Sequence, residues 1–207
     1  MTIILILAGL VLATSGYVQR KGARSRTEAE IAALSAALES YKADNGVYPR
    51  GQSTSKPPWD PNLGPSQYPI ATTGTDDLNA RVNGGPREPI YQYASRYLYE
   101  QLSGDVNLTL FQIPLVPPKK SYFDFKPSML WLIPDKEGNS IGLSYILDPF
   151  GNSYGYSTAY QADIDAGINP PNRGYNPTFD LWSTVGETGP KNGETFADYQ
   201  LRWIKNW

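Results

Sequence analysis

The chain has 207 residues, of which 18 are Lys or Arg and 20 are Asp or Glu, giving a formal net charge of -2. It contains no Cys and no His, which excludes disulfides, thiol nucleophiles, zinc sites of the usual kind and every catalytic triad with an imidazole base. Because the charge is slightly negative and basic residues are concentrated only at positions 20–26, nucleic acid is not an expected partner.

The chain opens with an apolar run over residues 3–13. Its large side chains are Ile3, Ile4, Leu5, Ile6, Leu7, Leu10, Val11 and Leu12. The run could be a signal peptide, a membrane anchor or an assembly stem. No basic segment precedes it, which disfavours a signal peptide, and residues 1–18 would give about 27 Å of helix against a hydrocarbon core of roughly 30 Å, a marginal span. A buried core helix could also be apolar over this length, but no polar face interrupts the run, so we favour a stem.

A basic neck follows the stem, and the sequence then becomes strongly helical. No Pro interrupts residues 1–46, and good helix formers dominate from position 19. Apolar side chains recur on one helical face at Ile31, Leu34, Leu38 and Tyr41. We therefore predict one long helix, about 65 Å at about 1.5 Å per residue, which packs on a sheet through these four side chains. We assign residues 1–26 to the stem and neck, and residues 27–207 to a globular domain.

The end of this helix carries a motif. Residues 30–49, which end in Asp44-Asn45-Gly46-Val47-Tyr48-Pro49, closely resemble the end of the long N-terminal helix of type IV pilin-like proteins, especially the major pseudopilin of type II secretion. Gly46 followed by Pro49 is also a good helix stop. Two later stretches resemble the same family in the same order. Residues 145–156 resemble a hairpin of the family, with Phe150 where the family has Trp, and Tyr175 to Ser183 resembles the family's next strand.

The resemblance implies an α+β fold of the type IV pilin-like kind, in which the helix packs on a small antiparallel sheet between about residues 145 and 185. It also implies a structural subunit of a helical filament, either a type IV pilus-like fibre or a type II secretion pseudopilus. Which of the two it is stays open. Family members begin with a basic leader, a Phe and a fifth-position Glu, and we expect these first residues to be missing before Met1.

The resemblance further implies partners and a location. The partners are other copies of the chain, the bacterial inner membrane before assembly, an assembly ATPase, a platform protein and prepilin peptidase. The location is the inner membrane first and then a periplasmic or extracellular filament. The alternative is a membrane-anchored, exported glycan-binding module or enzyme that uses the helix only as a tether.

Residues 51–145 have no counterpart in the family. Their aromatic content is too high for a disordered linker, so we expect a folded insertion that decorates the domain. Residues 91–102 predict a short amphipathic helix, and residues 108–116 and 129–133 are candidate strands. The aromatic side chains of this segment could form a glycan-stacking platform or fill the core, and we favour the core. They are Trp59, Tyr68, Tyr91, Tyr93, Tyr97 and Tyr99.

In the family, the loop after the Leu-Trp-Ser strand commonly binds calcium. The corresponding loop here offers Glu187, Glu194 and Asp198 as oxygen ligands. However, Arg202 and Trp203 stand where the family places an acidic pair. We therefore favour a loop without metal and expect no other cofactor.

Two close pairs of acids could in principle hydrolyse glycosidic bonds. They are Asp76 with Asp77, and Asp163 with Asp165. Nothing in their sequence context marks either pair as buried or poised, so we expect turn or surface roles and no enzymatic activity.

Overall fold

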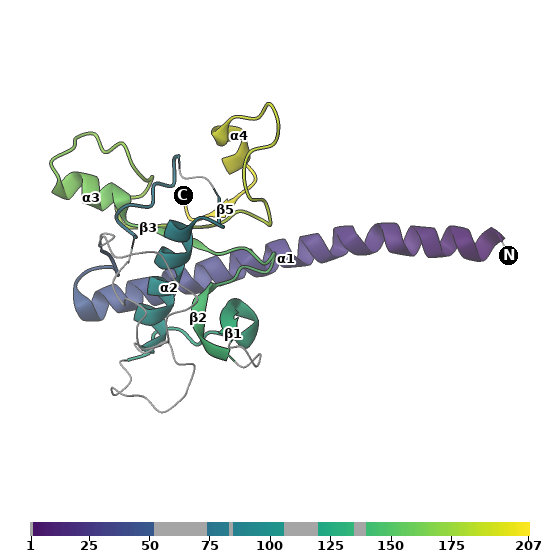
Figure 1. Ribbon diagram of the computed structural model, residues 1–207, viewed down its shortest axis with the longest axis horizontal. Helices are drawn as coiled ribbons and strands as arrows, with labels where there is room; N and C mark the ends of the chain where they lie inside the picture. Colours follow the sequence, from purple (N-terminus) through teal and green to yellow (C-terminus); the bar gives the residue numbers. More distant parts are fainter. Residues whose placement is uncertain (1, 52–73, 83–84, 106–119, 135–139) are drawn as a thin grey trace.

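The computed structural model describes residues 2–51, 74–82, 85–105, 120–134 and 140–207 (Figure 1). Over these residues the chain is α+β, as predicted. The helices are α1 (Thr2–Asn45), α2 (Pro89–Ser103), α3 (Ala159–Asp165) and α4 (Phe196–Gln200), with a 3-10 turn at Pro127–Met129. The strands are β1 (Leu130–Pro134), β2 (Ser140–Ile146), β3 (Gly155–Ser157), β4 (Asp180–Ser183) and β5 (Ile204–Lys205).

Helix α1 is continuous and extends well beyond the rest of the molecule (Figure 1). It ends at Asn45, where Gly46 takes a left-handed φ of 80° and its amide donates to the Lys42 carbonyl at 2.7 Å. This confirms the predicted helix stop. Of the side chains described, those of residues 16–22 are exposed and the first buried one is Thr27. Within the part of the chain that the structure describes, none of the helices combines the length and the apolarity needed to span a bilayer.

The second half of α1 lies against β4 and β5. Ile31, Leu34 and Leu38 are buried in the main core, and burial of each such side chain contributes about 1.5–3 kcal/mol. Tyr41 lies differently: it is only partly buried, and its hydroxyl donates to Gln101 of α2 at 3.0 Å. Three of the four predicted packing residues are therefore buried in the core, while the fourth packs against the core and also contacts α2.

The expected small antiparallel sheet contains β3, β4 and β5 in that order. We predicted a strand across residues 175–183, but β4 begins only at Asp180. The Asp180 carboxylate accepts hydrogen bonds from the amides of Tyr175 and Asn176 at 2.8 and 2.9 Å. Because these amides are engaged by a side chain, they cannot pair with a strand, and residues 175–179 form a loop.

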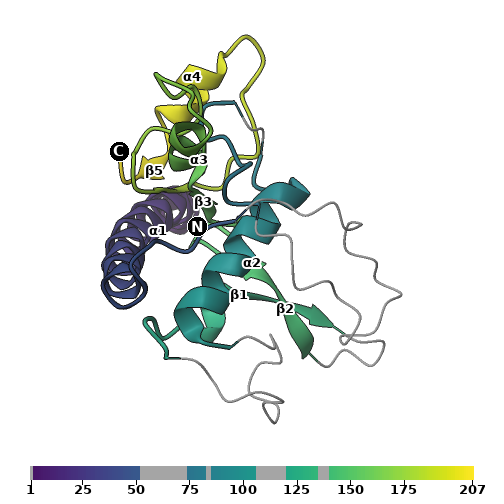
Figure 2. The same cartoon turned by 90° about the vertical axis from the view of Figure 1, so that its left-hand side faces the viewer.

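The segment after residue 51 is more than a decoration. Its predicted helix is confirmed as α2, and its candidate strand at residues 129–133 is confirmed as β1, which pairs antiparallel with β2. Leu98 and Leu102 of α2 are fully buried in the same core as Leu34 and Leu38. Figure 2 looks along α1, with β3, β5, α3 and α4 on one side and α2 with β1 and β2 on the other. The candidate strand at residues 108–116 lies outside the described residues.

Candidate functional site

The predicted stem lies in the part of α1 that projects from the domain (Figure 1). The structure gives a helical backbone there for Ile3, Ile4, Leu5, Ile6, Leu7, Leu10, Val11 and Leu12. This helix continues through the basic neck into the core without a break. The stem and the domain are therefore joined by one rod rather than by a loop.

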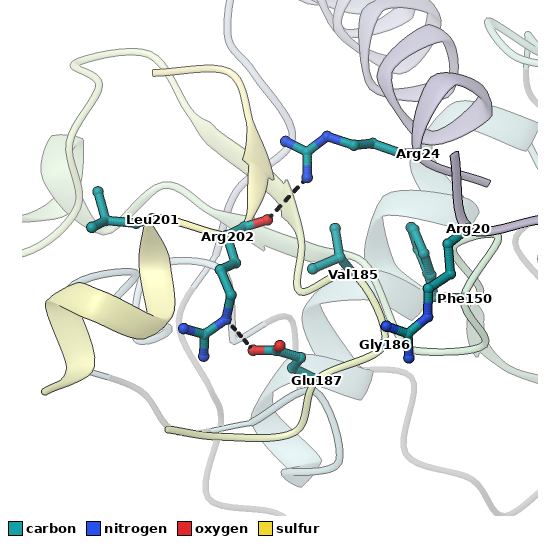
Figure 3. A pocket seen from close by; sticks show the side chains of 8 residues that line it. All are labelled: Arg20, Arg24, Phe150, Val185, Gly186, Glu187, Leu201 and Arg202. Carbon is teal, nitrogen blue, oxygen red and sulfur yellow. Dashed lines mark hydrogen bonds and ion pairs between the residues drawn. The ribbon is translucent and has the colours of Figure 1, made fainter. Parts of the chain in front are cut away.

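A groove of about 640 Å³ lies where the neck meets the domain (Figure 3). We call it the neck groove. Its lining consists of Arg20 and Arg24 from α1 and of Phe150, Val185, Gly186, Glu187, Leu201 and Arg202 from three later segments. Arg20 and Arg24 are one helical turn apart, so they project from the same face of α1. Val185 has a φ of 51°, which is a strained conformation for a β-branched residue.

Arg202 forms one wall of the neck groove and closes the loop in which calcium was considered. Its guanidinium bonds Glu187 at 2.6 Å and Glu194 at 2.8 Å, the second contact being bidentate. Hydrogen bonding to Arg202 lowers the pKa of Glu194 below its ordinary value. A guanidinium therefore occupies the position between two of the three candidate calcium ligands.

The third candidate ligand is engaged elsewhere. The Asp198 carboxylate accepts from the backbone amide and the hydroxyl of Thr195, at 3.0 and 2.7 Å, and so caps α4. Among the described residues, no three acidic side chains converge on a common point that could hold a metal ion.

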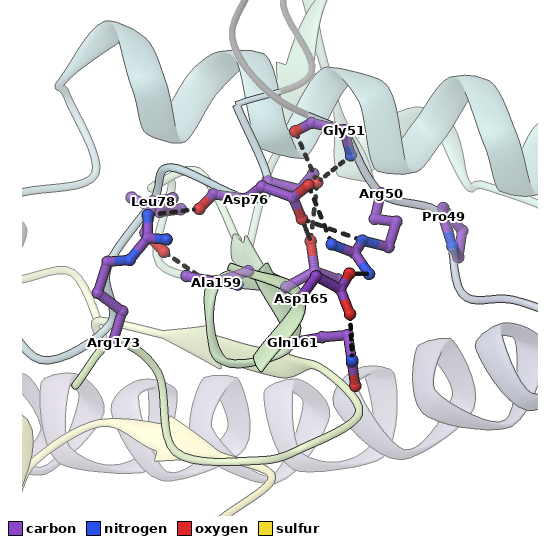
Figure 4. Close-up of polar contacts among 12 residues, drawn as sticks. Pro49, Arg50, Gly51, Asp76, Leu78, Ala159, Gln161, Asp165 and Arg173 are labelled. Atoms are coloured by element: carbon purple, nitrogen blue, oxygen red, sulfur yellow. Dashed lines mark hydrogen bonds and ion pairs between the residues drawn. The ribbon is translucent and has the colours of Figure 1, made fainter. Parts of the chain in front are cut away.

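Asp76, the first residue of the first pair of acids, is part of a polar network that fastens residues 74–78 to α3 (Figure 4), and its neighbour Asp77 is partly buried. Arg50 pairs with Asp76 at 3.3 Å and with Asp165 at 2.7 Å. The hydroxyl of Thr158 donates to Asp76 at 2.7 Å. Asp76 lies in a turn, one of the two roles we expected, but it is buried rather than at the surface. The network holds its carboxylate because a buried charge needs partners.

The second pair divides between the surface and the interior. Asp165 is exposed, whereas Asp163 is fully buried, which again corrects the expected surface role. Asp163 accepts from Arg173 Nε at 2.6 Å and from the amides of Asn172 and Arg173 at 2.9 Å. Burial alone would raise the pKa of Asp163, but these donors hold it below its ordinary value. The carboxylate therefore stays ionised and anchors the loop after α3.

The described aromatic side chains of the insertion mainly fill the interior. Tyr91 and Tyr99 are buried, and Tyr91 accepts from the indole of Trp182 at 3.0 Å. Tyr93 and Tyr97 are partly buried. Trp59 and Tyr68 lie outside the described residues.

An exposed aromatic pair lies instead on the β1–β2 ribbon and was missed from the sequence. Trp131 is 53% exposed and stacks on its cross-strand partner Tyr145, with 6.0 Å between ring centroids and 11° between planes. The run Leu130-Trp131-Leu132-Ile133 is apolar throughout, so it does not indicate that Trp131 faces outward, and the partner of Trp131 depends on a register that the sequence does not reveal.

The neck groove also had little signal in the sequence. Its arginines were recognised as part of a basic neck, but the walls come from segments around residues 150, 186 and 202 that only the tertiary fold brings together. Comparison of the chain with known protein families, with curated proteins and with solved structures gave no match.

Proposed function

We propose that the chain is a structural subunit of a helical filament, either a type IV pilus-like fibre or a type II secretion pseudopilus, that assembles through its apolar stem. The observation that carries this proposal is α1, one uninterrupted helix whose first half projects from the domain (Figure 1). That half bears the apolar run of residues 3–13. An apolar helix that projects in this way has to be covered by lipid or by other copies of itself.

The shape of the subunit fits an open assembly. Stems that pack side by side with an axial shift would make heterologous contacts, which continue as a helical filament when they do not close into a ring. The same apolar surface would lie in the inner membrane before assembly and in the bundle afterwards. An assembly ATPase, a platform protein and prepilin peptidase belong to this proposal as partners.

The packing of α1 in the domain supports a role for the helix in fixing the domain to the stem. Ile31, Leu34 and Leu38 are buried in the main core. Tyr154, which immediately precedes β3, donates a hydrogen bond from its hydroxyl to the Glu30 carboxylate at 2.7 Å. Moving α1 would therefore disrupt the core of the domain. A bundle of stems would fix the domains around it through these contacts.

The second candidate is an exported glycan-binding module that uses α1 as a tether. One observation favours it, the exposed stack of Trp131 on Tyr145. A flat, half-exposed aromatic face can stack against a sugar ring. This candidate requires no contact between copies of the chain.

Electron microscopy of the purified full chain after detergent removal tests the proposal. We expect fibres from the wild type and none from Leu7→Asp, because a carboxylate in an apolar bundle or a bilayer is costly. Val82→Asp is the matched control, since it adds a carboxylate at an exposed position of the domain and should leave assembly intact. Near-ultraviolet circular dichroism should show both variants folded.

Wild-type protein that stays monomeric under all conditions, or Leu7→Asp that forms fibres in normal amounts, would overturn the filament. Polysaccharide binding that Trp131→Ala abolishes, by protein that forms no fibres, would support the tether.

A further inference from the structure

The four basic residues of the neck differ in their surroundings. All four are exposed, but only Arg20 and Arg24 line the neck groove, and Lys21 and Arg26 do not. Figure 3 shows Arg20 and Arg24 extending from α1 toward the segment that holds Val185 and Gly186. Two charges of the neck are thus directed at one concave surface.

The groove retains an uncompensated positive charge. Arg202 and Lys191 together balance Glu187 and Glu194. Arg24 forms a pair with Glu28 at 3.3 Å in which both side chains are about half exposed, and such surface pairs are weak and exchange readily. Its Nη1 also donates to the Arg202 carbonyl at 3.4 Å, a contact that leaves its charge in place (Figure 3). Arg20 forms no ion pair with any of the described residues. The groove therefore attracts an anion mainly through Arg20 and Arg24.

The other walls are apolar. Phe150 and Val185 line the groove and pack against the main core, and Leu201, which also lines the groove, is 78% exposed. On the turn of α1 before Arg20, Tyr17 and Val18 are also largely exposed. A small hydrophilic anion would gain nothing from these surfaces, whereas an amphiphile would cover them. Guanidinium groups in turn bind phosphate through paired hydrogen bonds.

The position of the groove along α1 selects a bilayer lipid. Arg20 lies seven residues beyond the end of the apolar run at residue 13, which is about 10 Å of helix. That distance exceeds the headgroup layer on one side of a bilayer, roughly 5–8 Å, by a few ångströms, and Arg24 lies about 6 Å further along the helix. A stem embedded in hydrocarbon up to residue 13 would therefore hold the groove just outside the phosphates, which the long arginine side chains can reach by extending back toward the bilayer.

We propose that the neck groove binds the headgroup of an anionic phospholipid, with its phosphate on Arg20 and Arg24 and its glycerol and acyl chains directed toward the stem, past Tyr17 and Val18. This inference rests on the proposed function, because it takes the stem to lie in a membrane before assembly. The bound lipid would cover the exposed apolar rim of the free subunit and set its depth in the bilayer.

Native mass spectrometry of the full chain in a neutral detergent tests the site. The probes are phosphatidylglycerol and phosphatidylcholine with identical acyl chains, and inorganic phosphate is the competitor. We expect the wild type to retain one phosphatidylglycerol per chain with a preference of about tenfold over phosphatidylcholine, equivalent to about 1.4 kcal/mol. The double variant Arg20→Gln with Arg24→Gln should lose that preference.

The matched control is Lys21→Gln with Arg26→Gln, which also removes two positive charges from the neck, but at positions outside the groove. Gln preserves helix propensity in both variants. Retention of the preference by the control alone supports the site. Equal loss in both variants, no loss in either, or displacement of the lipid by equimolar inorganic phosphate would overturn it.

Electron microscopy of the same preparations separates this inference from the filament. Fibres without lipid preference would overturn the groove site only. Lipid preference without fibres from any preparation would overturn the filament and leave a lipid-contacting, membrane-anchored domain.

Discussion

At the scale of single residues, Gly155 is the position where the structure demands glycine most directly. It pairs across β3 and β4 with Trp182, and a Cβ on Gly155 would lie 2.1 Å from the Trp182 ring. Trp182 cannot move aside, because it is fully buried and stacks on Trp203 at 5.6 Å.

We expect Gly155→Ala to destabilise the domain by about 3 kcal/mol, at the upper end of the range for overpacking. Gly189→Ala is the control, since nothing lies within 4 Å of its added Cβ. Urea unfolding followed by Trp fluorescence measures both. Similar midpoints for the two variants would contradict the close approach at Gly155.

The buried carboxylate of Asp148 predicts a pH dependence of stability. It accepts from the amides of Phe150 and Asn152 at 2.9 Å. Burial nevertheless raises its pKa to about 6, although the Ser183 hydroxyl and the amides oppose the shift. Between about pH 4 and 6 the folded state therefore binds more protons than the unfolded state, so stability falls as the pH rises through 6. Asp180 has the same shift from the same cause.

The wild type should lose on the order of 2 kcal/mol of stability through Asp148 between pH 4.5 and 7.5, and we expect Asp148→Asn to remove this loss. The amide still accepts from the turn, and its NH₂ can donate to Ser183. Asp165→Asn is the control: hydrogen bonding to Gln161 and Arg50 lowers the pKa of Asp165, so this variant should change the pH dependence of stability only in more acidic solutions and leave the slope between pH 4.5 and 7.5 as in the wild type. Urea midpoints at four pH values measure both, and an unchanged slope in Asp148→Asn would refute the assignment.

At the scale of elements, Arg202 predicts how the loop between β4 and α4 is held. Its bidentate contact with Glu194 and its contact with Glu187 join both ends of the loop. Because Glu194 has a lowered pKa, the stabilisation is present above its unfolded pKa and is lost as the pH falls through the folded pKa.

We expect Arg202→Met to lower the melting temperature at pH 7 and to accelerate amide exchange in residues 187–198, with a smaller effect near pH 3. Arg202→Lys should restore the melting temperature and the slow amide exchange only in part, since lysine lacks the planar guanidinium that contacts both oxygens of Glu194. Lys191→Met removes an exposed partner of Glu187 and should have little effect. Equal effects of Lys191→Met and Arg202→Met would show that the fork does not hold the loop.

The elements that local patterns specify could be predicted. Helix α1 with its stop at Gly46, helix α2 and strand β1 depend on periodicity, capping and Pro placement within a few residues. The long-range arrangement could not be predicted. Arg50 contacts both Asp76 and Asp165, and Asp165 lies 115 residues after Arg50. The burial of Asp163 depends on how the loop that contains Arg173 folds back onto α3. The candidate site divides in the same way: the arginines of the neck are local, whereas the groove they line is tertiary.

At the scale of the whole molecule, the neck joins the projecting half of α1 to the half that packs in the domain. Gly22 is exposed inside α1, and a Cβ added there would meet no atom within 4 Å. Substitutions at this position therefore act on the backbone of the rod alone. The first buried side chain along α1 among those described is that of Thr27, so the core of the domain begins beyond Gly22.

Two substitutions at Gly22 separate the stiffness of the rod from the stability of the domain. Gly22→Pro removes a helical hydrogen bond and kinks the rod, at a local cost of about 3 kcal/mol, whereas Gly22→Ala favours the helix by about 1 kcal/mol. We expect both variants to keep the wild-type melting temperature within a few degrees. We expect fibres by electron microscopy from Gly22→Ala and none from Gly22→Pro, because stems in a bundle must set the direction of every domain through α1. Straight fibres of normal length from Gly22→Pro would mean that the stem and the domain can be joined flexibly, and that the continuity of α1 is not what orders the filament.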